Sequence, residues 1–172
     1  MHQNSFKQTL CIVILLLLLI GCATVPITGR SQINMISDEV LVALANESFS
    51  QFMALVSNRG MVLSPSETPE ATEILTTVNH VSQRIIDASD LRGHLNWETV
   101  VVKSKEINAF VMPNGKIIVF TGLLPVAKSE AGLAAVISHE IAHVVAHHQA
   151  ERVSQIVEFP EFFFSKTLNL LK

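Results

Sequence analysis

The stretch "INAFVMPNGKIIVFTG", residues 107–122, is the most informative part of the sequence for the fold, because two apolar runs flank the dipeptide Asn114-Gly115. Asn-Gly accepts the positive φ angles of a tight hairpin turn, so the stretch predicts two antiparallel strands. The β-branched run "WETVVVK", residues 97–103, predicts another short strand just before them. The sequence therefore predicts a small sheet made of a strand and a hairpin in the middle of the chain.

Helices are predicted before and after these strands in the sequence. Ser37 begins a helix that reaches about Asn58, and Thr68 with Pro69 begins another that ends near Ala88. Ser129 begins a third helix, "SEAGLAAVISHEIAHVVAHHQAERV", which is apolar on most sides and is therefore expected to lie buried in the domain centre. The fold class that follows is α+β, mainly helical, with the three-stranded sheet beside the third helix.

The third helix carries the motif HExxH. His139 and His143 are four residues apart, so their rings share one helix face and can converge on one metal ion. Glu140 can then act as a general base toward a water molecule whose pKa a zinc ion has lowered. The alternative is a core helix with hydrogen-bonded histidines; against it, an apolar helix could not bury three such groups without partners for them.

His147 follows one turn later and is predicted not to be a ligand. Eight residues separate it from His139, about 12 Å along a straight helix, which is too far for one ion. The longer motif with a third histidine uses a glycine to turn the chain, and this sequence has Ala146 and Gln149 at the positions in question. His147 and His148 are therefore interpreted as residues of the helix end, with a supporting role near the metal left open.

The N-terminus has the layout of a secretory signal. An apolar run at residues 10–20 is too short to span a membrane, and "LIGC", residues 19–22, looks like a bacterial lipobox. This predicts a signal peptide at 1–21, acylation of Cys22, a tether at 22–36 and one domain at 37–172. The alternative is an ordinary cleaved signal or an uncleaved anchor.

Composition narrows the chemistry further. Once Cys11 is removed with the leader and Cys22 is acylated, no thiol remains, so nitrogen and oxygen atoms must hold any metal. The net charge of −3 and the lack of a Lys/Arg cluster argue against nucleic acid as a partner. The oligomeric state is left open.

The hairpin stretch and the third helix together resemble the HExxH zinc metallopeptidase family forty-eight, which includes the CAAX prenyl endopeptidase and the mitochondrial inner-membrane stress protease. The lipobox followed by "VPITGRSQ" resembles the bacterial periplasmic lipoprotein branch of that family. The resemblance implies a zincin-like domain that binds one zinc ion (Zn²⁺) through His139 and His143, with Glu140 as the general base.

The resemblance also implies a substrate and a location. Asn108, Ala109 and Phe110 match the strand beside the active site, along which an extended substrate pairs, so unfolded or misfolded envelope proteins are the expected substrates. The protein would face the periplasm, held by its lipid on the outer membrane, because Ala23 rather than Asp follows the acylated cysteine.

One part of the family pattern is not visible in the sequence. The family's third zinc ligand is a glutamate on a later helix, and the later acids Glu151, Glu158 and Glu161 lack its motif. We therefore expect a chain that is C-terminally truncated relative to the family. Two hypotheses remain, a lipid-anchored zinc endopeptidase and a non-catalytic lipoprotein that binds unfolded segments or is an inactive fragment.

Overall fold

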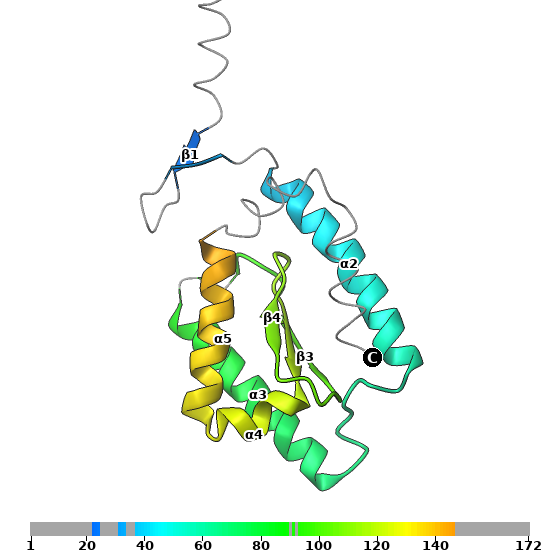
Figure 1. Cartoon of the computed structure of the whole chain (residues 1–172). Coiled ribbons are helices and arrows are strands. Elements are labelled where there is room, and N and C mark those ends of the chain that lie inside the picture. The colour runs from blue at the N-terminus through cyan, green and yellow to red at the C-terminus, as the bar shows by residue number, and fades with distance from the viewer. Residues whose placement is uncertain (1–21, 25–30, 34–36, 90, 92, 147–172) are drawn as a thin grey trace, which may run out of the picture.

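The computed structural model describes residues 22–24, 31–33, 37–89, 91 and 93–146 (Figure 1). The predicted signal peptide and everything after Ala146 lie outside the described residues. The elements, in chain order, are β1 (Cys22–Thr24), β2 (Ser31–Ile33), α2 (Asp38–Asn58), α3 (Pro69–Ala88), β3 (Glu98–Val102), β4 (Ala109–Val111), β5 (Lys116–Phe120), the 3-10 helix η1 (Thr121–Leu123), α4 (Leu124–Ala127) and α5 (Glu130–Val145).

The helices begin at the residues that the sequence predicts. Ser37, Thr68 and Ser129 are the N-caps of α2, α3 and α5, and each side chain accepts a hydrogen bond from a backbone N–H three residues later. α2 and α3 also end at Asn58 and Ala88 as predicted. Local side-chain chemistry is therefore enough to set these boundaries.

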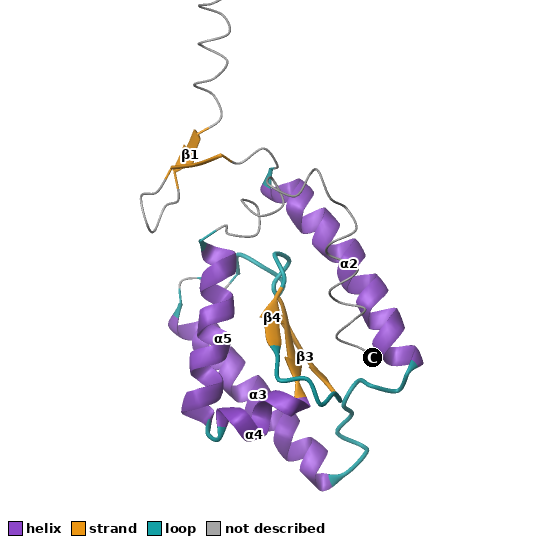
Figure 2. Ribbon diagram, in the orientation of Figure 1, coloured by secondary structure: helices purple, strands orange, loops and turns teal. Residues whose placement is uncertain are grey.

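Three strands form the central sheet, in the order β3-β5-β4. Figure 2 shows the strands of this sheet between α5 and α2. The predicted hairpin is confirmed, since β4 and β5 pair antiparallel, while β3 runs parallel to β5. All five residues of β5 are buried, as expected of a central strand. In the turn only Gly115 has a positive φ, 83°, because Met112 N–H pairs with Lys116 O and leaves a three-residue loop.

The two edges of this sheet differ. Residues 61–63 pair with the outer edge of β3, where Leu63 N–H donates to Val101 O at 2.9 Å and Lys103 N–H donates to Met61 O at 2.7 Å. β4 is the strand at the opposite edge. Among the described residues, β4 therefore provides the sheet edge at which a further strand could pair.

Side chains of the sheet alternate between two apolar layers, as strand geometry requires. One face packs on α3 and α5, and the other packs on α2, so the sheet lies between them (Figure 1). The first layer contains Val78, Val81, Ile86, Val101, Ala109, Val111, Ile117, Val119, Leu123, Leu133, Ile137 and Ile141. The second contains Ala45, Phe52, Val56, Val100, Val102, Met112, Ile118 and Phe120.

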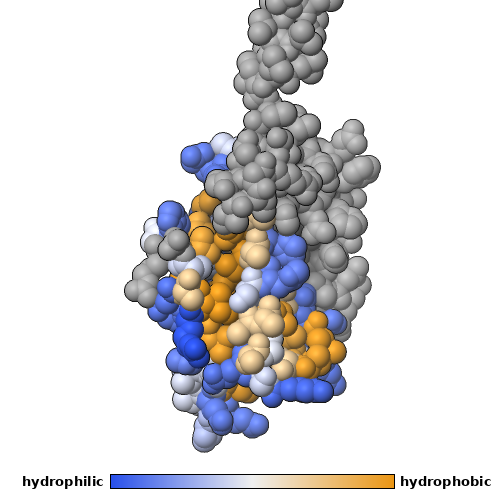
Figure 3. Space-filling view, turned by 90° about the vertical axis from the view of Figure 1, so that its left-hand side faces the viewer, coloured by the Kyte–Doolittle hydropathy of each residue, from blue (hydrophilic) through white to orange (hydrophobic). Residues whose placement is uncertain are grey.

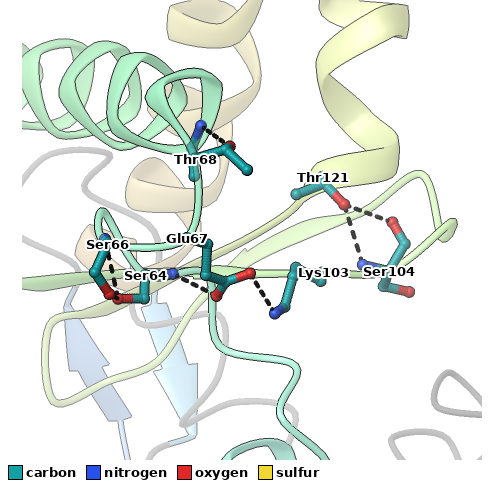
Figure 4. A network of polar contacts seen from close by, with 8 residues as sticks. Ser64, Ser66, Glu67, Thr68, Lys103, Ser104 and Thr121 are labelled. Carbon is teal, nitrogen blue, oxygen red and sulfur yellow. Dashed lines mark hydrogen bonds and ion pairs between the residues drawn. The ribbon is translucent and has the colours of Figure 1, made fainter.

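A polar network fastens the start of α3 to the end of β3 (Figure 4). Lys103 Nζ lies 2.7 Å from Glu67 Oε2, and Ser64 N–H donates to Glu67 Oε1 at 3.0 Å. The ammonium of Lys103, with the N–H of Ser64, holds the pKa of the Glu67 carboxyl below its usual value. The hydroxyl of Thr121 also donates a hydrogen bond to Ser104 O at 3.0 Å and accepts one from Ser104 N–H at 3.1 Å.

Some elements are absent from the sequence prediction. β1 and β2, paired antiparallel, lie within the segment predicted as a tether, and η1 with α4 fill the connection before α5. Gly132 explains the close approach of α4, because a Cβ there would lie 2.1 Å from Ala127 O. A run as short as "LLPVA" has too few residues to show a helical period.

α2 is long and apolar enough to cross a membrane, by length and composition, and no other described helix is. Phe52 and Val56 nevertheless pack it on the sheet, at 7% and 0% exposure. Within the described residues α2 therefore serves as the cover of one sheet face.

Candidate metal centre

α5 brings the two predicted zinc ligands together. His139 Nε2 and His143 Nε2 are 3.1 Å apart, with the ring planes at 79° to each other. Two nitrogens bound to one tetrahedral zinc ion at about 2.0–2.1 Å would be about 3.3–3.4 Å apart. The two rings therefore already have nearly the separation and convergence that a shared zinc ion requires.

Glu140 lies beside this pair and is half-buried. Helix geometry turns Glu140 about 100° from His139 and about 60° from His143 around the helix axis. Its side chain therefore lies next to the two histidines but not on the helix face that they share. A carboxylate in that position can reach a water molecule bound next to the histidines. The predicted role of general base requires the carboxylate to come within hydrogen-bond distance of that water.

The described residues supply two ligands of a metal centre and not three. No group of three or more His, Cys, Asp or Glu side chains within 37–89, 91 and 93–146 could hold a metal ion. His147, His148, Glu151, Glu158 and Glu161 lie outside the described residues. The donor groups present are two imidazoles with a carboxylate beside them, and imidazole nitrogens are common zinc ligands.

The prediction that α5 is buried on most sides is wrong for the described structure. Its buried residues are Leu133, Ile137 and Ile141, which form one stripe. The opposite face exposes His139 and three alanines, and Figure 3 shows apolar surface on this side of the molecule. Alanine raises the apolar content of a helix without needing burial, which explains the error.

This exposure also removes one argument for the metal. Because His139 is exposed, and His143 and Glu140 are only half-buried, the cost of burying unpaired polar groups does not apply to them. The convergence of the two rings is the stronger observation.

The predicted substrate strand is the edge strand. Asn108 O accepts from Phe120 N–H at 3.1 Å, and Met112 N–H donates to Lys116 O at 2.9 Å, so the even-numbered residues bond to β5. The alternation of an antiparallel pair then turns the N–H and C=O of Ala109 outward. Of the three predicted residues, Ala109 presents its backbone to the open edge, whereas those of Asn108 and Phe110 face β5.

β4 also lies against α5, on the face of the sheet that contains Ala109 (Figure 1). The side chain of Ala109 is a single methyl group, so it leaves room beside this part of the strand for another chain. An extended chain paired with β4 would therefore run alongside the helix that carries His139 and His143.

Sequence reasoning missed the aromatic residues on the other face of β4. Phe110 packs edge-on against Phe52 of α2, with ring centroids 6.0 Å apart, and tilted against Phe120 at 6.1 Å. Phe52 is visible in the sequence as a core residue of its helix, but nothing local indicates which strand it meets.

A hollow of about 340 Å³ lies between the start of α3 and the start of α5, lined by residues that include Glu70, Leu124 and Glu130. It does not include His139 or His143. Since it lacks the metal-binding side chains, we place the candidate site at the histidines.

An HExxH helix packed beside the edge strand of a small mixed sheet is the arrangement expected of a metallopeptidase domain. Peptidase family M48 matches residues 75–171, which include the sheet and α5. The chain belongs to this family, whose metallopeptidases are zinc-dependent.

The similar proteins include mitochondrial metalloendopeptidases. The chain is 38% identical over 130 residues to mitochondrial metalloendopeptidase OMA1 of Schizosaccharomyces pombe, which is 76% of this chain and 36% of the relative. It is 31% identical over 145 residues to the OMA1 metalloendopeptidase of Bos taurus, 83% of this chain and 27% of the relative.

A bacterial protein is also similar, one of Vibrio cholerae named provisionally as a beta-barrel assembly-enhancing protease. The identity is 28% over 104 residues, 60% of this chain and 20% of that protein. The chain therefore spans about a third or less of the length of these three relatives.

Proposed function

We propose that this chain carries the catalytic helix of a zinc-dependent metalloendopeptidase that hydrolyses unfolded or misfolded proteins of the bacterial cell envelope. The observation that carries the proposal is the 3.1 Å approach of His139 Nε2 and His143 Nε2, with Glu140 beside them and β4 alongside. The names of the relatives, all proteases, support it.

Each residue of the proposed site has a separate chemical role. His139 and His143 would hold the zinc ion with a third ligand from outside the described residues, in a zincin-like arrangement. Bound zinc supplies Lewis acidity that brings the pKa of water near 7. Glu140 takes the proton from the attacking water and gives it to the leaving amine, so one carboxylate acts as base and then as acid.

β4 binds and orients the substrate. Pairing with the outward N–H and C=O of Ala109 recognises any extended main chain, because backbone hydrogen bonds do not read side chains. A folded protein has few free strands, whereas an unfolded one offers many. This supports unfolded envelope proteins as the substrate class.

The location rests on the N-terminal sequence. Acylation of Cys22 would hold the protein on a membrane, facing the periplasm, and Ala23 favours the outer one. β1 begins at Cys22 and β2 ends at Ile33, so two paired strands stand between the lipid and α2.

A second candidate function is a binding module without catalysis. The observation that favours it is that the described residues provide two metal ligands instead of three. Such a lipoprotein would hold unfolded segments along β4 and release them intact.

The test measures zinc content and casein hydrolysis by the full 172-residue chain. Glu140→Gln is expected to keep zinc and to lose at least about 100-fold in hydrolysis, the usual contribution of a general base. Glu130→Gln makes the same change at an exposed position in the first turn of α5 and should leave hydrolysis unchanged.

If the unsubstituted chain neither binds zinc tightly nor cuts casein, catalysis by this chain is refuted and the binding module is favoured. Hydrolysis that survives Glu140→Gln would refute the role given to Glu140.

A further inference from the structure

The outer face of α2 is apolar in its first two turns. Val40 and Leu44 are 51% and 52% exposed, and Ala43 between them is exposed as well. With about 100° of rotation per residue, these three side chains centre about 140° around the helix from its buried residues, which pack toward the sheet. They therefore form one apolar patch, the outer patch, that points away from the sheet.

The outer patch ends at the third turn of α2. Further along the same face lie Glu47, Ser50 and Gln51, which are exposed and polar, and then the small Ala54. Gln51 Nε2 donates to Glu47 Oε1 at 2.7 Å. The large apolar side chains of the outer face are therefore confined to the end of α2 that is closest along the chain to Cys22.

The pairing of β1 with β2 shortens the chain between the proposed lipid and the outer patch. Cys22 lies opposite Ile33, and paired residues of antiparallel strands are about 5 Å apart. Val40 comes seven residues after Ile33, and a chain of that length spans at most about 25 Å. Cys22 therefore lies within about 30 Å of Val40, whereas the same segment without the pairing could extend to roughly 60 Å.

We propose that the outer patch docks on the surface of the bilayer that holds the lipid of Cys22. The inference rests on the proposed function, because it needs the acylation of Cys22. Val40 and Leu44 enter the boundary between headgroups and acyl chains, as the apolar face of an interfacial helix does.

The lipid anchor explains why so small a patch is enough. Burying the exposed halves of two such side chains is worth a factor of about thirty in affinity, which by itself is too little to hold a protein on a membrane. Beside an anchor, however, the contact is intramolecular and the effective concentration of lipid is high. The patch therefore sets the orientation of a protein that the acyl chains already hold.

The charges around the outer patch select the headgroup. Asp38, Glu39 and Glu47 are exposed acids within one turn of the patch, and α2 contains no lysine or arginine. Anionic headgroups repel these carboxylates, whereas zwitterionic headgroups such as phosphatidylcholine or phosphatidylethanolamine do not. The partner is therefore a zwitterionic phospholipid surface.

Docking through α2 also orients the candidate metal centre. α2 and α5 cover opposite faces of the sheet (Figure 1). With α2 on the bilayer, the sheet lies between the membrane and α5. The exposed His139 then faces the periplasm, from which unfolded chains approach.

The experiment places a fluorescent probe in the outer patch. The full chain is expressed in a bacterial host, and the acylated protein is reconstituted in phosphatidylcholine vesicles. Ala43→Cys supplies a thiol for a nitrobenzoxadiazole label, and it is the only free thiol once Cys11 is removed and Cys22 is acylated. Ala135→Cys, at an exposed alanine of α5, is the matched control.

Quenching by lipids that carry a nitroxide on the acyl chain measures the contact. The label at position 43 should lose about half of its emission or more, because an interfacial helix lies about 5–10 Å into the headgroup boundary. The label at position 135 should lose almost none. Vesicles of phosphatidylglycerol should reduce the quenching at position 43, because the acids next to the patch are repelled.

Substitutions in the patch locate the effect. Val40→Ser combined with Leu44→Ser, both at exposed positions and therefore compatible with the fold, should reduce the quenching at position 43 at least about threefold. Val126→Ser, at a position of 53% exposure on α4, should leave it unchanged.

Equal quenching at positions 43 and 135, or quenching that the double substitution leaves unchanged, would overturn the docking surface. A patch that instead joins two copies would show label emission that depends on protein concentration and resists the nitroxide lipid, and this too would overturn it. Mass spectrometry that finds no acyl group on Cys22 refutes the anchor and the docking together, whereas an acylated chain without selective quenching refutes the docking alone. Selective quenching of a chain that does not cut casein would support the docking and refute the peptidase.

Discussion

At the scale of single residues, the spacing of His139 and His143 is what would let them share the proposed zinc ion. A helix brings residues four apart onto one face, and here the two Nε2 atoms are 3.1 Å from each other. The same helix also positions Glu140, because this residue directly follows His139 in the chain. Five consecutive positions of one helix thus set most of the local geometry.

Removing one imidazole tests that geometry. His139→Ala is expected to weaken zinc binding at least about 100-fold, since losing a ligand costs no less than losing the groups that support one. The fold should be preserved, because His139 is exposed. Zinc titration with a competing chelator measures the affinity, and circular dichroism checks the helix content.

His80→Ala on α3 is the matched control, also an exposed histidine on a helix. Equal zinc affinity in the His139→Ala variant and the unsubstituted chain would contradict the assignment of His139 as a ligand.

At the scale of elements, β5 and its neighbours position the site. β5 is central, residues 61–63 pair with the far edge of β3, and β4 remains at the edge beside α5. The hairpin could be predicted because Asn114-Gly115 is a local signal. The parallel pairing of β3 with β5 could not, since it joins strands through a connection whose path depends on the whole fold.

The ion pair between Glu67 and Lys103 ties α3 to β3, and it makes stability depend on pH. A carboxyl whose pKa is lower in the folded chain stabilises the fold above its unfolded pKa, and this contribution is lost as the pH falls through the folded pKa. Glu67→Gln should therefore lower the free energy of unfolding slightly at pH 7, since the pair is exposed. The difference from the unsubstituted chain should vanish as the pH falls well below 4.5, the ordinary value for this group.

Urea unfolding at several pH values measures this difference. Glu73→Gln, at an exposed acid of α3, is the matched control. A difference for Glu67→Gln that grows as the pH falls would contradict the direction assigned to the pKa.

At the scale of the whole molecule, the helix α5, which carries the candidate site, packs beside β4 on one face of the sheet, and α2 covers the other face. Buried apolar residues on both faces hold this arrangement, and Phe120, Ile117, Ile118 and Ile137 are almost completely enclosed. Each such side chain contributes about 1.5–3 kcal/mol when buried. The orientation of α5 toward β4 is therefore a consequence of the core as a whole.

The membrane anchor is the prediction that concerns the entire chain. In a bacterial host, Cys22→Ser should move the protein from the membrane fraction to the soluble fraction, because the acyl chains would no longer be attached. Fractionation followed by immunoblotting measures the distribution, and Cys11→Ser, within the predicted leader, is the control. A Cys22→Ser variant that remains in the membrane fraction would contradict lipid anchoring at this residue.

Features that depend on neighbours along the chain could be predicted from the order of the residues alone. Capping by Ser37, Thr68 and Ser129, the turn at Gly115 and the pairing of His139 with His143 all depend on residues within about one helical turn. These interactions are local, so a pattern of residue types is enough to reveal them.

Which surfaces meet could not be predicted from the sequence and follows from the fold. The contact of Phe52 with Phe110, the exposed outer face of α5 and the open edge at Ala109 depend on how the helices pack on the sheet. Packing is a property of the complete core, in which residues far apart in the chain compete for the same space. For that reason the candidate metal ligands and the candidate substrate strand are visible in the sequence, whereas the outward backbone of Ala109 and the contact of α2 with β4 become visible in the fold.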